Sequence, residues 1–272
     1  MQESLTPRTV GAEAQLDPEE VRLKVEENWG ECCVATGGTR VDLKGAGAWV
    51  NTVARRAAGH SNIVLPLKAT TQDYPQILDE ANKLFRHDKL AYVFYASPVP
   101  SKPINDVFLS KGLTGGQDEQ TYMIYAAAGD KKERPRVDVR LVEPKHVDRW
   151  AEVIYTSFGW PTDTKQGWTE SMTKAAQDER VRPLMAYIND KPAGGLLLFS
   201  NHKVGSIYEV GTHPDFRNRG VAASLVAGGV EDSQNRGDKL TWLRTTRGYA
   251  EQMYKKLGLI TSYRGVSYRF SP

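Results

Sequence analysis

Residues 208–225 read YEVGTHPDFRNRGVAASL, and this stretch decides the fold that the sequence predicts. The pattern indicates a strand, then a tight turn around Gly220, then a helix that begins near Val221. Gly220 lets the backbone come close to a ligand, and the small side chain of Ala222 leaves the start of the helix open. Because a helix N-terminus exposes unpaired N–H groups and a partial positive charge, the turn predicts a seat for a pyrophosphate.

Charged residues support a ligand that carries phosphates. Arg217 and Arg219 add cationic donors at the edge of the turn. The whole chain has 36 basic and 33 acidic side chains and a net charge of +3. This balance, with the basic residues scattered along the chain, argues against a nucleic-acid partner, whereas a mild basic excess suits a small phosphorylated ligand.

The rest of the second half predicts alternating strands and helices. Strands are expected at 137–142, 182–189, 194–200, 205–212 and 239–245 and in a last segment that ends at Phe270, and helices at 145–157, 166–176, 221–235 and 249–257. Strands in series followed by a strand–helix–strand unit indicate an α+β fold, in which helices cover the faces of one sheet.

The first half predicts a similar mixture. After a polar leader over 1–16, helices are expected at 17–30, 48–58, 72–86 and 103–110, and strands at 62–67, 89–96 and 120–126. The segment 129–135 is charged, has no apolar residue and ends in proline, which is typical of a linker. We therefore expect two domains, 1–132 and 133–272.

A faint repeat links the two halves. Lys111-Gly112-Leu113 is followed by Tyr122, ten residues after the glycine, and Leu257-Gly258-Leu259 is followed by Tyr268 at the same spacing. Each of these segments comes at the end of its half, so the repeat suggests two related units.

Three segments of the second half, taken together, resemble the GNAT family of acyl-CoA-dependent N-acetyltransferases. RNRGVA at 217–222 is similar to the family's acyl-CoA loop, Arg/Gln-x-x-Gly-x-Gly/Ala, and VGTHP at 210–214 resembles the strand that precedes it. AEQMYKKLGL at 250–259 is similar to the family's Ala-x-x-x-Tyr-x-Lys-x-Gly-Phe segment. The first half has no phosphate-type loop and looks like a degenerate second copy, as in tandem GNAT proteins. The resemblance implies a mixed, mostly antiparallel central sheet flanked by helices in two GNAT-like domains.

The resemblance also implies roles for individual residues. The backbone of Val210 and Thr212 would pair with the pantetheine arm of acetyl-CoA, and the Val210 N–H would polarise the thioester carbonyl. Tyr254 would protonate the departing thiolate. The residues implied to bind acetyl-CoA are Val210, Gly211, Thr212, Arg217, Asn218, Arg219, Gly220, Val221, Ala222 and Ala223.

The base that deprotonates the acceptor amine is less well defined. Glu209 is the nearest carboxylate, although strand alternation puts it on the face opposite Val210. In the histone-modifying branch of the family a glutamate lies earlier on this strand, where this chain has Ser206. Arg247 is a second departure, because the family often has asparagine there to contact the coenzyme.

The acceptor pocket of the family is usually framed by its first two helices, which here are joined by FGWPTD at 158–163. Phe158 and Trp160 would then form an apolar wall, and Asp163 would meet a cationic amine. The alternative is that the two aromatic side chains are core packing.

The function that these features favour is transfer of an acetyl group from acetyl-CoA to a primary amine of a small molecule, by direct attack in a ternary complex. No nucleophile is evident near the loop, because the adjacent Cys32 and Cys33 lie in the other half. A protein or peptide acetyltransferase and a non-catalytic acyl-CoA sensor remain alternatives.

We expect no metal, because a second cysteine pair with metal-type spacing is lacking. We also expect no membrane segment and a cytoplasmic monomer or homodimer, because 1–15 show no secretory signal and no apolar run spans a bilayer.

Overall fold

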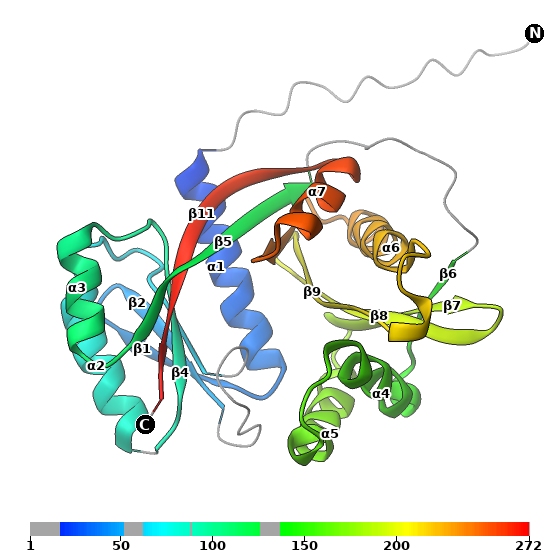
Figure 1. Cartoon of the computed structure of the whole chain (residues 1–272), viewed down its shortest axis with the longest axis horizontal. Helices are drawn as coiled ribbons and strands as arrows, with labels where there is room; N and C mark the ends of the chain where they lie inside the picture. The colour runs from blue at the N-terminus through cyan, green and yellow to red at the C-terminus, as the bar shows by residue number, and fades with distance from the viewer. Residues whose placement is uncertain (1–16, 52–61, 88, 126–136, 272) are drawn as a thin grey trace, which may run out of the picture.

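The computed structural model describes residues 17–51, 62–87, 89–125 and 137–271. Its strands form one 11-stranded sheet in the order β1-β2-β3-β4-β11-β5-β10-β9-β8-β7-β6 (Figure 1). The neighbours β3–β4 and β9–β10 are parallel, and all other neighbouring strands are antiparallel. The predicted α+β fold with a mixed, mostly antiparallel sheet is therefore confirmed.

The second half contains the elements that the sequence predicts, with boundaries that differ by a few residues. They are β6 (Asp138–Leu141), α4 (Val147–Phe158), α5 (Lys165–Ala175), β7 (Val181–Ile188), β8 (Lys191–Asn201), β9 (Val204–Thr212), α6 (Val221–Asn235), β10 (Leu240–Thr245), α7 (Gly248–Lys256) and β11 (Leu259–Phe270). Three short 3₁₀ turns are η1 (Pro144–His146), η2 (Thr162–Thr164) and η3 (Pro214–Phe216).

The first half repeats the element order of the later part of the second half, from β7 to β11. It contains α1 (Pro18–Ala35), β1 (Thr39–Leu43), β2 (Ala46–Val50), β3 (Ile63–Leu65), α2 (Tyr74–His87), β4 (Tyr92–Ala96), α3 (Lys102–Ser110) and β5 (Thr114–Tyr125). The series β1-β2-β3-α2-β4-α3-β5 thus matches β7-β8-β9-α6-β10-α7-β11. In each series the third and fourth strands are the parallel pair.

The faint sequence repeat falls on corresponding elements of the two series. Gly112 follows α3 and Gly258 follows α7, each with a positive φ, of 85° and 93° respectively. This left-handed conformation ends a helix, and glycine adopts it without a steric penalty. Each glycine leads into a 12-residue strand, β5 or β11, that carries the buried tyrosine of the repeat.

The last strands of the two halves are exchanged. β11, the end of the chain, lies between β4 and β5, whereas β5, from the first half, pairs with β10 of the second half. In Figure 1, β5 and β11 run side by side through the middle of the molecule. The two halves therefore share one sheet, and the division at 132/133 falls in 126–136, outside the described residues.

Helix α1 connects the halves through buried polar side chains. Arg22 pairs with Glu26 at 2.9 Å, and the Glu26 carboxylate accepts a hydrogen bond from the Leu67 N–H at 2.8 Å. Arg22 also donates to the Leu67 carbonyl, so α1 occupies the backbone groups of the loop between β3 and α2. On the same helix Asn28 donates to the carbonyl of Val204 in β9.

Two predictions in the first half are wrong. The part of the predicted helix 48–58 that the structure describes belongs to strand β2, which pairs with both β1 and β3. Its alanines favour a helix, but this tertiary pairing overrides local propensity. Strand β1 is missing from the prediction because it is short, and only Val41 and Leu43, both partly buried against the core, are apolar in it. The leader and the linker lie outside the described residues.

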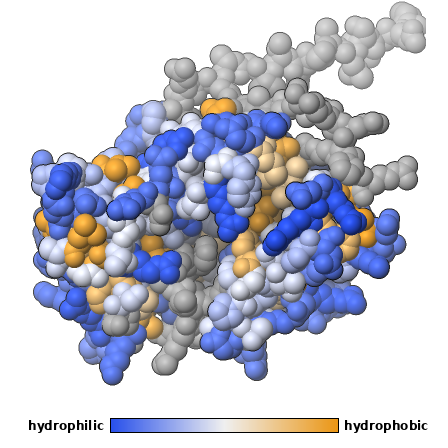
Figure 2. Space-filling view, in the orientation of Figure 1, coloured by the Kyte–Doolittle hydropathy of each residue, from blue (hydrophilic) through white to orange (hydrophobic). Residues whose placement is uncertain are grey.

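The surface is mainly hydrophilic on the face that Figure 2 shows, with apolar side chains in small groups. Large exposed apolar side chains include Tyr249 and Ile260, a distribution that is ordinary for a folded domain. None of the described helices is both long enough and apolar enough to cross a membrane.

The strand exchange predicts that the second half does not fold by itself. A fragment of residues 133–272 would expose the edge of β10 and leave β11 without β4 and β5, so we expect aggregation or association in size-exclusion chromatography. Co-expression with residues 1–132 is expected to restore a soluble complex. A monomeric fragment with a cooperative unfolding transition would contradict the exchange.

Candidate functional site

Strands β9 and β10 part in the middle of the sheet. Their parallel pairing runs from Val204 opposite Leu240 to Ile207 opposite Leu243. Beyond that point β9 continues to Thr212, while β10 stays paired with β5 through Thr245. The stretch 208–212 therefore has an edge that does not face β10 within the ladder, and an extended ligand can pair with such an edge.

A β-bulge shapes this part of β9. Leu197 lies opposite Tyr208 and Gly195 lies opposite Gly211, so two residues of β9 face the single residue Leu196. Glu209, in the bulge, has a φ of 53°, a conformation that non-glycine residues rarely adopt. The Leu196 carbonyl accepts a hydrogen bond from the Trp150 indole of α4 at 3.1 Å, so α4 holds the strand opposite the bulge.

The bulge sends consecutive side chains to the same side of the sheet. Tyr208 and Glu209 both line a cavity on the face of α1 and α5, whereas Val210 packs on the opposite face with the core beneath α6. The expectation that Glu209 and Val210 lie on opposite faces thus agrees with the geometry. Simple strand alternation does not predict that Tyr208 and Glu209 share a face.

The cavity has a volume of about 60 Å³ and lies where the two halves meet. It is lined by Trp29, Cys32, Cys33, Thr36, Asn51, Trp168, Ser171, Met172, Leu197, Tyr208 and Glu209. Although Cys32 and Cys33 are far from β9 in sequence, the C-terminal part of α1 brings them beside Glu209. Burial raises the pKa of both thiols, that of Cys33 to about 12, so they stay protonated at neutral pH.

Aromatic side chains of the α4–α5 connection lie beside this cavity. The rings of Phe158 and Trp160 stack at 4.7 Å, and Trp160 makes an edge contact at 5.8 Å with Trp168, which lines the cavity. Both Phe158 and Trp160 are half-buried, and they pack against the core of α4 and α5. Core packing and a pocket wall are thus compatible here. Asp163 is exposed in turn η2.

The turn before α6 has the predicted shape. Gly220 caps the helix with a φ of 77°, Asn218 also has a positive φ of 61°, and α6 begins at Val221. The backbone N–H groups of residues 221–223, which include Ala222 and Ala223, lie in the first turn, where a helix offers no internal acceptor. This end of α6 therefore presents donors and the positive end of the helix dipole.

The two arginines of the turn differ in their contacts. Arg217 donates to the Ser157 carbonyl at the end of α4 at 3.1 Å, so its side chain connects the turn to α4. The guanidinium of Arg219 lies 5.6 Å from the centre of the Phe216 ring. The sequence predicts phosphate contacts for both, and the structure shows that Arg217 also positions the turn.

Glycines bring α4 and α6 close to the parted strand. A Cβ on Gly211 would lie 2.8 Å from Ser157 Cβ. One on Gly194 would lie 2.5 Å from the Gly211 carbonyl oxygen and 2.6 Å from Val221 Cγ1. Such distances do not occur between real atoms, so glycine at 194 and 211 is needed for the close approach of the elements.

Tyr254 lies on α7, with 7% of its surface exposed, among the residues of the core beneath α6. Burial raises the pKa of its phenol to about 12, so it is a protonated donor at neutral pH. Arg247, at the start of the same helix, donates to the Tyr249 hydroxyl at 2.7 Å.

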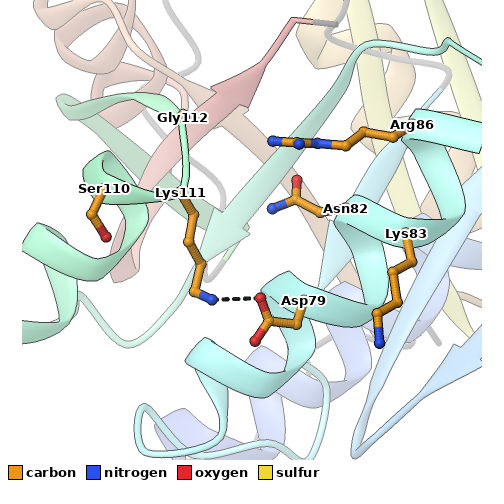
Figure 3. Close-up of a pocket in the computed structure, with 7 residues that line it drawn as sticks. All are labelled: Asp79, Asn82, Lys83, Arg86, Ser110, Lys111 and Gly112. Atoms are coloured by element: carbon orange, nitrogen blue, oxygen red, sulfur yellow. Dashed lines mark hydrogen bonds and ion pairs between the residues drawn. The ribbon is translucent and has the colours of Figure 1, made fainter.

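A second hollow lies on the first half, far from these residues in the sequence, and has a volume of about 540 Å³. Figure 3 shows side chains of α2 and of the end of α3 around it, with Lys111 paired with Asp79. Its other cations, Lys83 and Arg86, are exposed. An open hollow lined by exposed charges is ordinary solvated surface, and it contains no residue of the predicted site.

Residues 147–259 match the model of the acetyltransferase (GNAT) family. The second half of the chain belongs to the GNAT family. The matched segment includes the Gly220 turn, the bulge at Glu209 and the helix that carries Tyr254. Among curated proteins, none matches the chain significantly.

The fold of both halves together is similar to that of three solved structures, two of which are GCN5-related N-acetyltransferases. A GCN5-related N-acetyltransferase from Kribbella flavida superposes with a TM-score of 0.70 at 14% identity, over 93% of this chain and 96% of that one. A GCN5-related N-acetyltransferase from Sphaerobacter thermophilus gives a TM-score of 0.62 at 18% identity, over 83% of this chain and 76% of that one. A functionally unknown conserved protein from Staphylococcus epidermidis gives a TM-score of 0.64 at 13% identity, over 86% of this chain and 94% of that one. At these identities the similarity concerns the fold.

Gly194 provides a test of how the GNAT loop is held. Gly194→Ala is expected to cost about 1–3 kcal/mol of stability, because its new Cβ overlaps the strand and the first residue of α6. It should also weaken CoA binding, measured by calorimetry. Gly167→Ala is the matched control, since a Cβ there meets nothing within 4 Å. Equal melting temperatures and CoA affinities for the two variants would contradict this account.

Proposed function

We propose that the chain transfers an acetyl group from acetyl-CoA to a primary amine of a small molecule, by direct attack in a ternary complex. The observation that carries the proposal is the parted edge of β9, which has the N-terminus of α6 on one face of the sheet and a cavity with a carboxylate on the other. Such an arrangement can hold a nucleotide thioester and an amine at the same time.

On the donor side, the first-turn amides of α6 bind the pyrophosphate, and the pantetheine arm pairs with the backbone of Val210 and Thr212. A thioester carbonyl placed beside the Val210 N–H gains stabilisation of the oxyanion that forms on attack. These assignments are supported by the free edge of β9 and by the Gly220 turn.

On the acceptor side, an amine must lose a proton before it attacks, because a lysine-like ammonium has a pKa of about 10.4. Glu209 accepts this proton, and the nitrogen bonds to the thioester carbonyl carbon. As the C–S bond breaks, the nitrogen releases its second proton to solvent and becomes the amide. Tyr254 protonates the leaving thiolate, and its raised pKa keeps the phenol protonated for this step.

The cavity favours a small acceptor over a polypeptide. Its volume is about 60 Å³, and α1 of the first half forms one of its walls. A peptide needs an open groove along the sheet. A direct reaction is also favoured over an acyl-enzyme, because the two thiols at the cavity are buried and protonated.

A panel of small primary amines, amino acids and short peptides, followed by thiol release from acetyl-CoA, tests the function. We expect turnover with small amines, and a decrease in kcat of about 100-fold in Glu209→Gln with unchanged CoA affinity. Glu231→Gln, an exposed site on α6, is the control. CoA uptake without turnover of any amine would support the sensor alternative instead.

Tyr254→Phe tests the role of Tyr254 as the acid that protonates the leaving thiolate. We expect kcat to fall about 10- to 100-fold while CoA still binds, because only the proton donor is lost. In the unmodified chain, the pKa of about 12 implies that ionisation of Tyr254 causes no loss of activity between pH 7 and 10. An alkaline decline of kcat near pH 9 that Tyr254→Phe abolishes would contradict the raised pKa, and an unchanged kcat in Tyr254→Phe would disprove the role as acid.

A further inference from the structure

Arg244 lies on β10 one residue beyond its last pair with β9, where the two strands begin to part. Its alternate neighbours Trp242 and Leu240 belong to the core cluster packed against α1, so Arg244 points to the face of α1. This is also the face on which Glu209 lines the cavity. Two groups of opposite charge therefore lie on the two parted strands, on the same side of the sheet.

Aromatic rings and an amide hold the guanidinium of Arg244. It lies 4.7 Å from the ring centre of Trp29 and 4.5 Å from that of Tyr95, and it donates to the Gln120 side-chain oxygen at 2.6 Å. Trp29 also lines the cavity, so one side chain contacts both the guanidinium and the proposed acceptor site. These contacts fix the orientation of Arg244 but supply no negative charge.

Arg244 has no carboxylate beside its guanidinium, which distinguishes it from the other buried or half-buried arginines in the described ranges. Arg22, Arg180 and Arg182 each form an ion pair with an aspartate or glutamate. No ion pair with a carboxylate involves Arg244 in the part of the chain that the structure describes, although the side chain is half-buried. A shielded charge without a counterion is costly, and an anionic ligand would lower that cost.

We propose that the acceptor amine also carries a carboxylate, which Arg244 binds while Glu209 receives the proton of the ammonium group. The acceptor is therefore an amino acid or a close homologue. The proposal rests on the acetyl-transfer function proposed above and names its substrate class.

The charges of a zwitterion match this arrangement. A guanidinium can bind a carboxylate with two parallel hydrogen bonds. Arg244 has five N–H groups, so donors remain besides those bound to Gln120 and to the Tyr95 side chain. The carboxylate takes no part in bond making: only the amine nitrogen is acylated, and of its two departing protons the first passes to Glu209 and the second to solvent. Binding at Arg244 would direct the amine towards the other strand.

The experiment compares matched acceptors that differ only at the carboxylate. For amino acids of increasing size, from glycine to phenylalanine, each acid is assayed beside its primary amide and its decarboxylated amine, by thiol release from acetyl-CoA. For the unmodified chain we expect kcat/KM for the acid to exceed that for the amide by about 30-fold or more.

Arg244→Gln should reduce this ratio to near one, and Arg244→Lys should give an intermediate ratio, because lysine keeps the charge but loses the planar fork. Arg236→Gln, at an exposed position after α6, is the charge-matched control and should keep the full ratio. Because the ratio is taken within one variant, partial unfolding does not alter it. If Arg244→Gln fails to fold, the acid-to-amide ratios of kcat/KM for Arg244→Lys and for the unmodified chain test the proposal instead.

The outcomes separate the two proposals. Equal turnover of acids, amides and amines by the unmodified chain would overturn the carboxylate site and leave acetyl transfer intact. An Arg244→Gln variant that keeps its preference for acids would also overturn it. Absence of turnover with every acceptor would reject the acetyl-transfer function, and the carboxylate proposal with it.

Discussion

The site depends on one feature of the sheet, namely that β9 and β10 pair as far as Ile207 and Leu243 and then part. Two sets of contacts keep them apart. β10 stays hydrogen-bonded to β5, and β9 stays paired with β8 through the bulge at Glu209, where the Trp150 indole of α4 binds the Leu196 carbonyl. Below the branch point, Asn28 of α1 binds the Val204 carbonyl and accepts a hydrogen bond from the Trp242 indole, which joins both strands to one helix.

The exchange of the last strands ties the two halves together, although only the second half has the glycine turn at the start of α6. β5 supplies the edge that holds β10 in place, and α1 supplies a wall of the cavity. In the first half the corresponding loop has a different use, because Arg22 and Glu26 of α1 occupy the N–H and carbonyl of Leu67. The first half therefore contributes to the shape of the site in the second half.

Charge is also divided between the two faces of the sheet. The face beneath α6 offers backbone amides and a helix dipole, whereas the face towards α1 and α5 combines Glu209 with Arg244 amid aromatic rings. Low polarity around these groups strengthens their interaction with a charged ligand, because fewer water dipoles screen it. The thiols in the same cavity stay neutral for the same reason, since burial penalises the thiolate.

The sequence by itself determined the α+β class, nearly every element of the second half, the Gly220 turn and the placement of Tyr254 on a short helix. These features depend on local backbone preferences and on short periodic patterns, which act within a few residues. Only the tertiary structure decided the exchange of β5 and β11, the strand at β2, the cavity around Cys32 and Glu209, and the place of Arg244 beside Trp29. Strand β2 pairs with its neighbours in the sequence, β1 and β3, whereas the other features join residues far apart in the chain. All of them depend on packing between elements, which no local pattern encodes.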